Sequence, residues 1–326
     1  MIKIVVDMMG GDLGSVETKK AVAEFLSMHD DVEIYAVGDI EELKDLNNVK
    51  EIIPSTKIMP MDIGAMDALR AKDTSMMISV ETMKKINGDA LVSCGSTGAL
   101  LTCSAVKLKK IPGVSRPALI SPVPTLIEGK RTVLLDLGAS NENTSDELIQ
   151  FAKMGSLYYK SVYGVEIPSV FLLSNGSEEH KGSPEGKEAY DKLKEMDFKG
   201  FKGNIEANKI LTGVADVVVT NGYAGNIFLK ATEGCSNTYK TCLRNMFKSS
   251  LLTKIGYLFV RKGINEMSTK LSSKTTGGAM LVGISKVVVK AHGNSDALAF
   301  KNALEVAYKC AKANIIEEIE KGLQNA

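Results

Sequence analysis

The chain has 326 residues, a formal net charge of +1, 24% charged residues and 44% hydrophobic residues. It is long enough for one large α/β domain or two intimate ones, with an ample core in either case, and its near-neutral charge gives no reason to expect nucleic acid binding. Met1 leads directly into an apolar run, and no apolar run approaches the roughly 18 residues of a membrane span, so we expect a cytoplasmic protein without a signal peptide.

Metal and nucleotide cofactors are disfavoured by the motifs that the chain lacks. Its five cysteines show no CxxC spacing, and there are only three histidines, so we expect reduced thiols and no metal. Neither a G-x-G-x-x-G fingerprint nor a G-x-x-x-x-G-K-[ST] loop is present, which disfavours NAD and ATP. We therefore expect no cofactor.

Six short apolar runs are each followed by a cluster of Gly, Asn and Ser, and most of these clusters are followed by a helical pattern. Continuous apolar runs of this kind predict buried parallel strands. The six predicted strands are residues 2–6, 90–92, 133–135, 170–173, 217–219 and 287–289. Because open α/β sheets bind ligands beyond the carboxyl ends of their strands, we expect these six loops to meet along one edge and hold an anion, most simply phosphate.

Two of the loops are candidates for phosphate binding through backbone amides. Gly10 and Gly11 follow the first strand, while Ser96, Thr97 and Gly98 lie where a strand turns into a helix. Small residues expose N–H groups, and a helix N-terminus favours negative charge. The alternative is that the glycines only permit tight turns and close packing.

The middle of the chain is less regular. Residues 111–125 hold four of the eight prolines, which predicts loop or edge backbone rather than a central strand. Residues 148–159 and 187–196 predict helices, and residues 295–322 predict one long helix or two segments.

Three loop side chains are candidates for catalysis. Lys181 is a cation suited to phosphate, Asn226 offers an amide that can donate to an oxyanion, and His292 directly follows a predicted buried strand. The alternatives are a solvated surface lysine, a helix cap and a structural histidine. Cys94 has no charged base near it in sequence, so we do not expect a nucleophile there.

Residues 236–273 interrupt the alternation of strands and helices. Between residues 240 and 274 the chain carries eight basic residues against one acid, Glu266. The basic residues are Lys240, Arg244, Lys248, Lys254, Arg261, Lys262, Lys270 and Lys274.

An apolar stripe runs along the same segment at helical spacing. It consists of Leu251, Leu252, Ile255, Leu258 and Phe259. One interpretation is a packed helix whose stripe is core or subunit interface. The other is an amphipathic helical pair that contacts anionic lipid or an acidic protein, with Lys248, Lys254 and Arg261 beside the stripe.

Taken together, these loops resemble the acyl-ACP:phosphate acyltransferases of bacterial phospholipid synthesis, the PlsX family. The resemblance runs nearly end to end, in order. It includes VDMMGGD at 6–12, DALVSCGSTGALL at 89–101, LLDLGAS at 134–140, LLSNGSEEHKG at 172–182, DVVVTNGYAGNIFLKATEG at 216–234 and AHGNS at 291–295.

The chain departs from the family pattern at several positions. Ser96 and Ser140 stand where the family usually has Asn, Asn221 stands where Asp is usual, and Cys94 stands where Ala is typical. If the two missing Asn side chains bind substrate in the family, this chain uses hydroxyl groups instead or is slower.

The resemblance implies a fold and an activity. The implied fold is a three-layer α/β sandwich with a mostly parallel central sheet, like isocitrate dehydrogenase and phosphotransacetylase. It would be a single domain over residues 1–326 with a protruding basic helical insertion at 237–275. The implied enzyme is a homodimeric acyltransferase that moves a fatty acyl group from acyl carrier protein to inorganic phosphate, with peripheral membrane contact. As a separate hypothesis, we expect the acyl chain to lie in an apolar groove lined by the stripe at 251–259. The alternatives are a short-chain phosphotransacylase that uses acyl-CoA, and a non-catalytic protein that binds an acyl ligand at a membrane surface.

Overall fold

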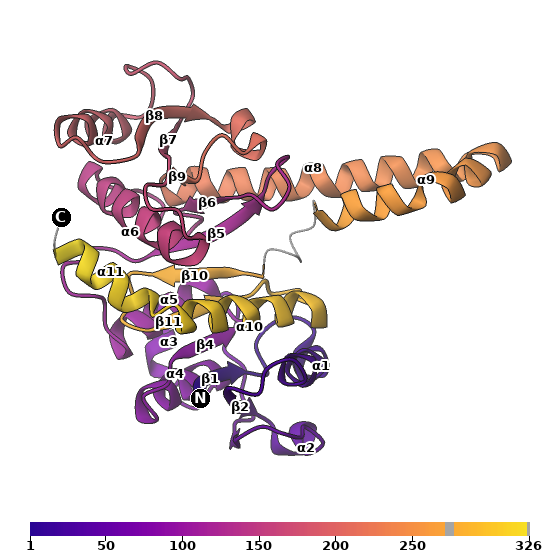
Figure 1. Cartoon of the computed structure of the whole chain (residues 1–326). Helices are drawn as coiled ribbons and strands as arrows, with labels where there is room; N and C mark the ends of the chain where they lie inside the picture. The colour runs from indigo at the N-terminus through magenta and orange to yellow at the C-terminus, as the bar shows by residue number, and fades with distance from the viewer. Residues whose placement is uncertain (271–276, 325–326) are drawn as a thin grey trace.

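The computed structural model describes residues 1–270 and 277–324, and its strands form one central sheet (Figure 1). The strands are β1 (Ile2–Asp7), β2 (Val32–Gly38), β3 (Glu51–Pro54), β4 (Ala90–Ser93), β5 (Ala118–Pro124), β6 (Arg131–Leu135), β7 (Val170–Ser174), β8 (Phe201–Glu206), β9 (Val217–Val219), β10 (Ala279–Val282) and β11 (Val287–Lys290). Their order in the sheet is β3-β2-β1-β4-β11-β10-β5-β6-β9-β7-β8. All six predicted strands are confirmed.

Helices cover both faces of the sheet, which confirms the expected three-layer α/β sandwich. The helices of the described chain are α1 (Gly14–Leu26), α2 (Ile40–Leu43), α3 (Ala65–Arg70), α4 (Ser75–Lys85), α5 (Thr97–Lys107), α6 (Ser145–Tyr163), α7 (Pro184–Glu195), α8 (Gly222–Lys248), α9 (Leu251–Lys270), α10 (Ala297–Lys312) and α11 (Ile315–Gln324), with a 3₁₀ turn η1 (Ala207–Thr212). The helix predicted at 148–159 is α6, that at 187–196 is α7, and the C-terminal pattern divides into α10 and α11.

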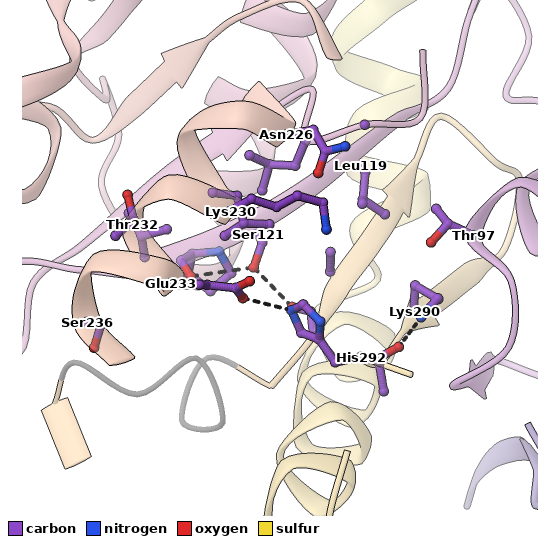
Figure 2. Close-up of a pocket in the computed structure, with 18 of the residues that line it drawn as sticks. Thr97, Leu119, Ser121, Asn226, Lys230, Thr232, Glu233, Ser236, Lys290 and His292 are labelled. Atoms are coloured by element: carbon purple, nitrogen blue, oxygen red, sulfur yellow. Dashed lines mark hydrogen bonds and ion pairs between the residues drawn. The ribbon is translucent and has the colours of Figure 1, made fainter. Parts of the chain in front are cut away.

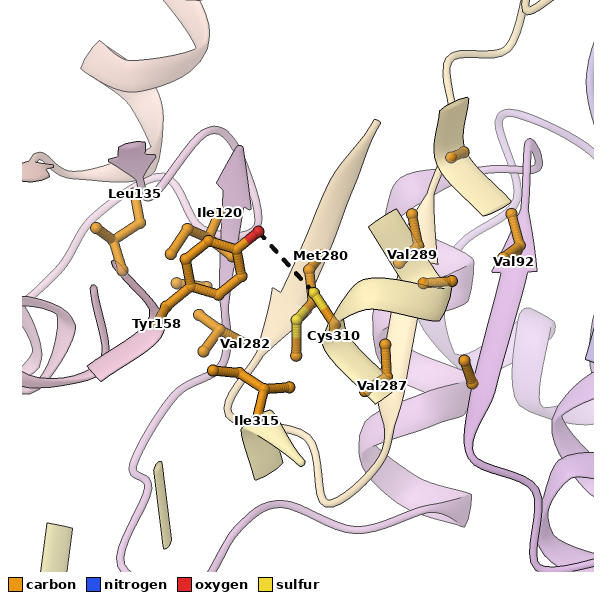
Figure 3. Packing of buried hydrophobic residues seen from close by; sticks show 14 of the residues in the cluster. Val92, Ile120, Leu135, Tyr158, Met280, Val282, Val287, Val289, Cys310 and Ile315 are labelled. Atoms are coloured by element: carbon orange, nitrogen blue, oxygen red, sulfur yellow. Dashed lines mark hydrogen bonds between the residues drawn. The ribbon is translucent and has the colours of Figure 1, made fainter. Parts of the chain in front are cut away.

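Alternate strand residues pack into two separate cores. Ile4 and Val6 of β1 belong to the core that contains Phe300 of α10, while Val5 belongs to the core that contains Met76 of α4. Figure 3 shows the first core, where Tyr158 lies against the strands. Since both faces are covered, the strands are apolar throughout, which is why continuous apolar runs predicted them.

The two halves of the sheet run in opposite directions. Strands β3, β2, β1, β4 and β11 are mutually parallel, and so are β6, β9, β7 and β8. Between them, β10 and β5 are antiparallel to both of their neighbours, so the second half is reversed relative to the first. The expectation that all six loops lie along one edge is therefore wrong, because three of them lie at each edge.

The prediction of loop or edge backbone for the proline-rich segment is also wrong for residues 118–124, because β5 is a central strand of the sheet. Strand β10 pairs with β5 only over Ala118–Ile120, and β6 pairs with it over Ser121–Pro124. Pro122 and Pro124 thus lie where a single neighbour flanks the strand, and the missing N–H groups are tolerated there.

The expected helical pair consists of α8 and α9, which project away from the sheet (Figure 1). Helix α8 begins at Gly222, directly after the loop that follows β9, so the insertion predicted from residue 237 begins within this helix, and its boundaries stay a prediction. Lys274 and the predicted boundary at 275 lie outside the described residues. Over the described part of the chain, no helix combines the length and apolar character needed to cross a membrane.

Candidate active site

The loops after β1, β4 and β11 come together around a buried carboxylate. Asp7 accepts hydrogen bonds from Ser93 Oγ (2.7 Å), the Gly10 amide (3.2 Å) and the Met9 amide (3.3 Å), and burial raises its pKa. The Asp12 amide donates to the Gly293 carbonyl at 2.7 Å, which joins the first and last of these loops. We call residues 7–12, 93–98 and 290–294 the Asp7 cluster.

The loops after β6 and β9 meet at the other edge around a second buried carboxylate. Asp136 accepts from the amides of Leu119 (2.8 Å), Ala139 (3.0 Å) and Ser140 (2.8 Å). A Cβ on Gly225 would lie 1.9 Å from the Asp136 carbonyl oxygen, so only glycine lets α8 approach this closely. We call residues 136–143 and 220–226 the Asp136 cluster.

A cavity of about 740 Å³ extends between the two clusters, beneath α8 and over β5 and β10. Its apolar lining includes Leu119, Val123, Leu137, Leu211 and Leu229. Its polar lining includes Thr97, Ser121, Asn226, Lys230, Glu233, Lys290 and His292. Figure 2 shows Asn226 and Lys230 of α8 across the cavity from Thr97, Lys290 and His292. One cavity therefore receives side chains from both loop clusters, although the clusters lie at opposite edges of the sheet.

Asn226 lies on this cavity rather than capping α8. The cap is Asn221, whose side chain accepts from the Ala224 amide at 2.8 Å. Asn226 follows in the first turns of the helix, beside Gly138 of the Asp136 cluster. Its carboxamide is thus placed to donate to an occupant of the cavity.

His292 faces Glu233 of α8 across the cavity. Its Nε2 lies 3.1 Å from Glu233 Oε1, and their side chains are 45% and 24% exposed. The hydrogen bond from His292 lowers the pKa of Glu233 below its ordinary value. The pair joins the loop after β11 to α8, so it helps to close the cavity at this end.

Most of the residues predicted to bind phosphate, Gly10, Gly11, Ser96, Thr97 and Gly98, do not line the cavity. Of this set, only Thr97 lines the cavity. The Gly10 amide is taken by Asp7, and Gly11 packs against the Gly293 carbonyl, so both glycines build the loop framework. Ser96 is the N-cap of α5, and its side chain accepts no amide of the first turn.

Lys181 lies in the loop between β7 and α7, at the same edge of the sheet as Asn226, but it does not line this cavity. The Asn204 side chain holds the loop by donating to the Glu178 carbonyl at 2.8 Å. The catalytic role of Lys181 stays a prediction.

The apolar stripe of α9 lies away from the cavity. Leu251, Leu252 and Phe259 are 74%, 82% and 84% exposed, and no stripe residue is part of the lining. The expectation that the stripe lines the acyl groove is therefore not met by this cavity. Within the described chain the stripe is a surface feature rather than core.

Two lysines of the cavity were missed from the sequence. Lys290 ends β11 and is only 8% exposed, and burial lowers its pKa. Lys230 lies four residues after Asn226 in α8 and points into the cavity (Figure 2). The i,i+4 spacing from Asn226 could have indicated Lys230. Lys290 had only a weak signal, a charged residue at the end of a run predicted to be buried.

The departures from the family pattern have local structural roles. Ser140 Oγ lies 2.7 Å from Asp136 Oδ2, inside the Asp136 cluster. Cys94 is buried, and that burial raises the pKa of its thiol to about 12, which fits the expectation that it is not a nucleophile. No group of three His, Cys, Asp or Glu side chains in the described ranges could hold a metal ion.

The order of the strands and the cavity between the two halves of the sheet define an α/β protein with the fold of the phosphotransacetylases. A phosphotransacetylase from Streptococcus pyogenes superposes with a TM-score of 0.61 at 18% identity, covering 96% of this chain and 94% of that chain. A branched-chain phosphotransacylase from Enterococcus faecalis V583 gives a TM-score of 0.58 at 14% identity, with 95% and 99% covered.

Closer relatives identify the family. The family model described as "Fatty acid synthesis protein" matches residues 2–318. Proteins named phosphate acyltransferase from Fervidobacterium nodosum and Lactococcus lactis subsp. cremoris are 38% and 40% identical, each covering 99% of both chains. The chain therefore belongs to the phosphate acyltransferase (PlsX) family of fatty acid synthesis proteins and is a transferase.

Proposed function

We propose that this chain transfers a fatty acyl group from the thioester of acyl carrier protein to inorganic phosphate, giving acyl phosphate and the free carrier thiol. The observation that supports this most is the cavity itself, which combines an apolar lining with polar groups from both loop clusters. The apolar lining suits an acyl chain, and the polar groups suit an anion and a reacting carbonyl.

The chemistry needs no covalent enzyme intermediate. A phosphate oxygen attacks the thioester carbonyl carbon, the C–S bond then breaks, and the carrier leaves as a thiolate. Holding the two reactants in line can contribute about 7–11 kcal/mol to the lowering of the barrier. Since a thiolate needs little protonation, His292 acts as a binder or orienter rather than an obligatory acid.

Each predicted residue then has a proposed role. The carboxamide of Asn226 donates to the developing oxyanion. Thr97 and the first-turn amides of α5, which follow the N-cap Ser96 and include that of Gly98, bind phosphate at the positive end of the helix. Gly10 and Gly11 support this loop, and Lys181 is the predicted charge partner at the opposite edge.

The helical pair is the proposed contact for the carrier protein. A groove of about 320 Å³ between α8 and α9 is lined by basic residues that include Lys240, Arg244, Lys248 and Lys254. Such a groove is complementary to an acidic protein. Arg261 lies farther along α9.

The exposed stripe Leu251, Leu252, Ile255, Leu258 and Phe259 is the proposed membrane contact or dimer surface of a cytoplasmic homodimer. Flotation with vesicles containing anionic lipid tests the membrane contact. We expect Leu252→Glu to weaken flotation, with Val165→Glu as a control on another exposed surface. Equal flotation of the two variants would refute this contact.

The reaction is tested by incubating the chain with acyl carrier protein thioester and phosphate and trapping acyl phosphate with hydroxylamine. We expect phosphate-dependent hydroxamate, and none above background would refute the reaction. A parallel assay with acyl-CoA separates the short-chain phosphotransacylase alternative, which requires faster turnover of the CoA thioester. Stoichiometric acyl binding without turnover would support the non-catalytic alternative.

The catalytic roles are tested by Asn226→Ala and Lys181→Ala. We expect Asn226→Ala to lower kcat about 10²–10³-fold, as removal of an oxyanion donor does. Asn237→Ala on the exposed part of α8 and Lys187→Ala in α7 are matched controls. Near-normal turnover of either test variant would refute the role of that residue without refuting the reaction.

A further inference from the structure

Lys290 is a buried cation at the wall of the cavity. Its side chain is 8% exposed, and its Nζ donates to the Cys94 carbonyl at 3.3 Å and to the Ala291 carbonyl. These contacts hold the ammonium at the carboxyl end of β11, among the loops of the Asp7 cluster. They leave the ammonium with neutral acceptors only.

No carboxylate of the described residues forms an ion pair with Lys290, whereas Lys19, Lys50 and Lys301 each pair with an acid. The charged or titratable groups that influence it are Asp12, which is exposed and beyond ion-pair distance, and Cys94, whose thiol pKa is raised to about 12 by burial. A buried charge without a partner is strongly unfavourable. An anion in the cavity would compensate it.

A second positive feature lies at the same end of the cavity. Helix α5 begins at Thr97, which lines the cavity as Lys290 does, and no side chain of its N-cap residue occupies the first-turn amides. Helix N-termini carry a partial positive charge and present free N–H groups. Figure 2 shows Thr97 beside Lys290, on the side of the cavity opposite Asn226.

We propose that Lys290 is the residue that binds inorganic phosphate, together with the first turn of α5. This inference rests on the proposed function and names the site of its second substrate. Lys290 then binds the phosphate from within the cavity, and the role predicted for Lys181, which does not line this cavity, is tested separately. Lys290 would act on binding of phosphate rather than on the oxyanion, because Asn226 approaches the cavity from the other cluster.

The test compares Lys290→Met and Lys290→Arg with Lys286→Met, a matched control directly before β11, where the lysine donates to the Asn87 side chain. Steady-state rates are measured against phosphate and against acyl carrier protein thioester. We expect Lys290→Met to raise the KM for phosphate about 10- to 100-fold, as loss of a charged hydrogen bond does, with the KM for the acyl donor changed by less than about twofold. A fall in kcat with an unchanged KM for phosphate would overturn the proposal.

A binding measurement keeps the inference separate from the reaction. The melting temperature is followed with rising inorganic phosphate and no acyl donor. We expect phosphate to stabilise the wild type and Lys286→Met but not Lys290→Met, with partial recovery in Lys290→Arg. The same phosphate response in all variants would overturn the proposal. If Lys290→Met does not fold by circular dichroism, Lys290→Arg and Lys290→Gln carry both measurements.

The two hypotheses fail differently. If the wild type yields no hydroxamate but phosphate still stabilises it through Lys290, the acyl transfer falls and the anion site stands. If hydroxamate forms and Lys290→Met keeps a normal phosphate KM, the anion site falls and the reaction stands.

Discussion

The Asp7 cluster and the Asp136 cluster use the same device at opposite edges of the sheet. In each, a fully buried aspartate at the carboxyl end of a strand accepts backbone amides of the loop that follows, and glycines let a second loop approach. They differ in what they offer the cavity. The Asp7 cluster supplies Lys290, His292 and the N-terminus of α5, whereas the Asp136 cluster supplies Asn226 at the start of α8.

The two clusters therefore suit different reactants of the proposed reaction. The ammonium of Lys290 in the Asp7 cluster suits the phosphate, and the neutral amide of Asn226 in the Asp136 cluster suits the carbonyl oxygen of the acyl donor. Because the halves run in opposite directions, a helix that contacts both clusters must extend from one edge of the sheet toward the other. Helix α8 does so, with Asn226 near its start and Glu233 paired to His292.

The largest effect on stability is expected at Asp136, the buried carboxylate of the Asp136 cluster. Asp136→Ala leaves the amides of Leu119, Ala139 and Ser140 without their acceptor. The Leu119 amide is buried and costs about 1–3 kcal/mol when it is unpaired, and the part-buried amides of Ala139 and Ser140 add less, so we expect a loss of about 2–4 kcal/mol in the free energy of unfolding. Urea denaturation measures it. Glu142→Ala, an exposed acid in the same loop, is the control, and equal stability of the two variants would contradict the role of Asp136.

The approach of α8 to the Asp136 cluster is tested at Gly225. A Cβ there would meet the Asp136 carbonyl oxygen at 1.9 Å, so the helix must shift, and we expect Gly225→Ala to cost about 1–3 kcal/mol and to lower activity. Gly234 in the same helix has nothing within 4 Å of its Cβ position. Gly234→Ala should therefore stabilise the fold by about 0.5–1 kcal/mol. Thermal unfolding distinguishes the two, and destabilisation by both would show that the close approach is not the cause.

The smallest effect on stability is expected at the pair of His292 and Glu233, which joins the loop after β11 to α8. The pKa of Glu233 is lowered by its hydrogen bond with His292, so its contribution to stability is present above the ordinary value of 4.5 and is lost as pH falls through the folded pKa. Because the pair is partly exposed, we expect Glu233→Gln to cost at most about 1 kcal/mol at neutral pH. The difference from the wild type should vanish at pH values below the folded pKa. A difference that does not change with pH would show that the carboxylate charge is not involved.

The sequence predicted the strands better than their directions. Buried strands such as β4 and β11 are visible as apolar runs, since both of their faces are covered. The reversal of the second half depends on β5 and β10. The prolines of β5 make its sequence resemble a loop, and β10 is only four residues long. Neither segment therefore predicts an antiparallel central strand.

The site was predicted in part for a similar reason. Thr97, Asn226 and His292 follow predicted strands and do line one cavity. Lys290 belongs to a strand, and its exposure to the cavity depends on how β11 meets the loop after β4, which is a tertiary contact. Lys181 follows a strand of the second half just as Asn226 does, but its strand β7 lies farther from β5 in the sheet than β9, and Lys181 is not part of the cavity lining.

The most direct test of phosphate binding between the two clusters is a crystal structure with arsenate, located by the anomalous scattering of arsenic. We predict a peak within hydrogen-bonding distance of Lys290 Nζ and the first-turn amides of α5. A peak beside Lys181, with none in the cavity under α8, would contradict it.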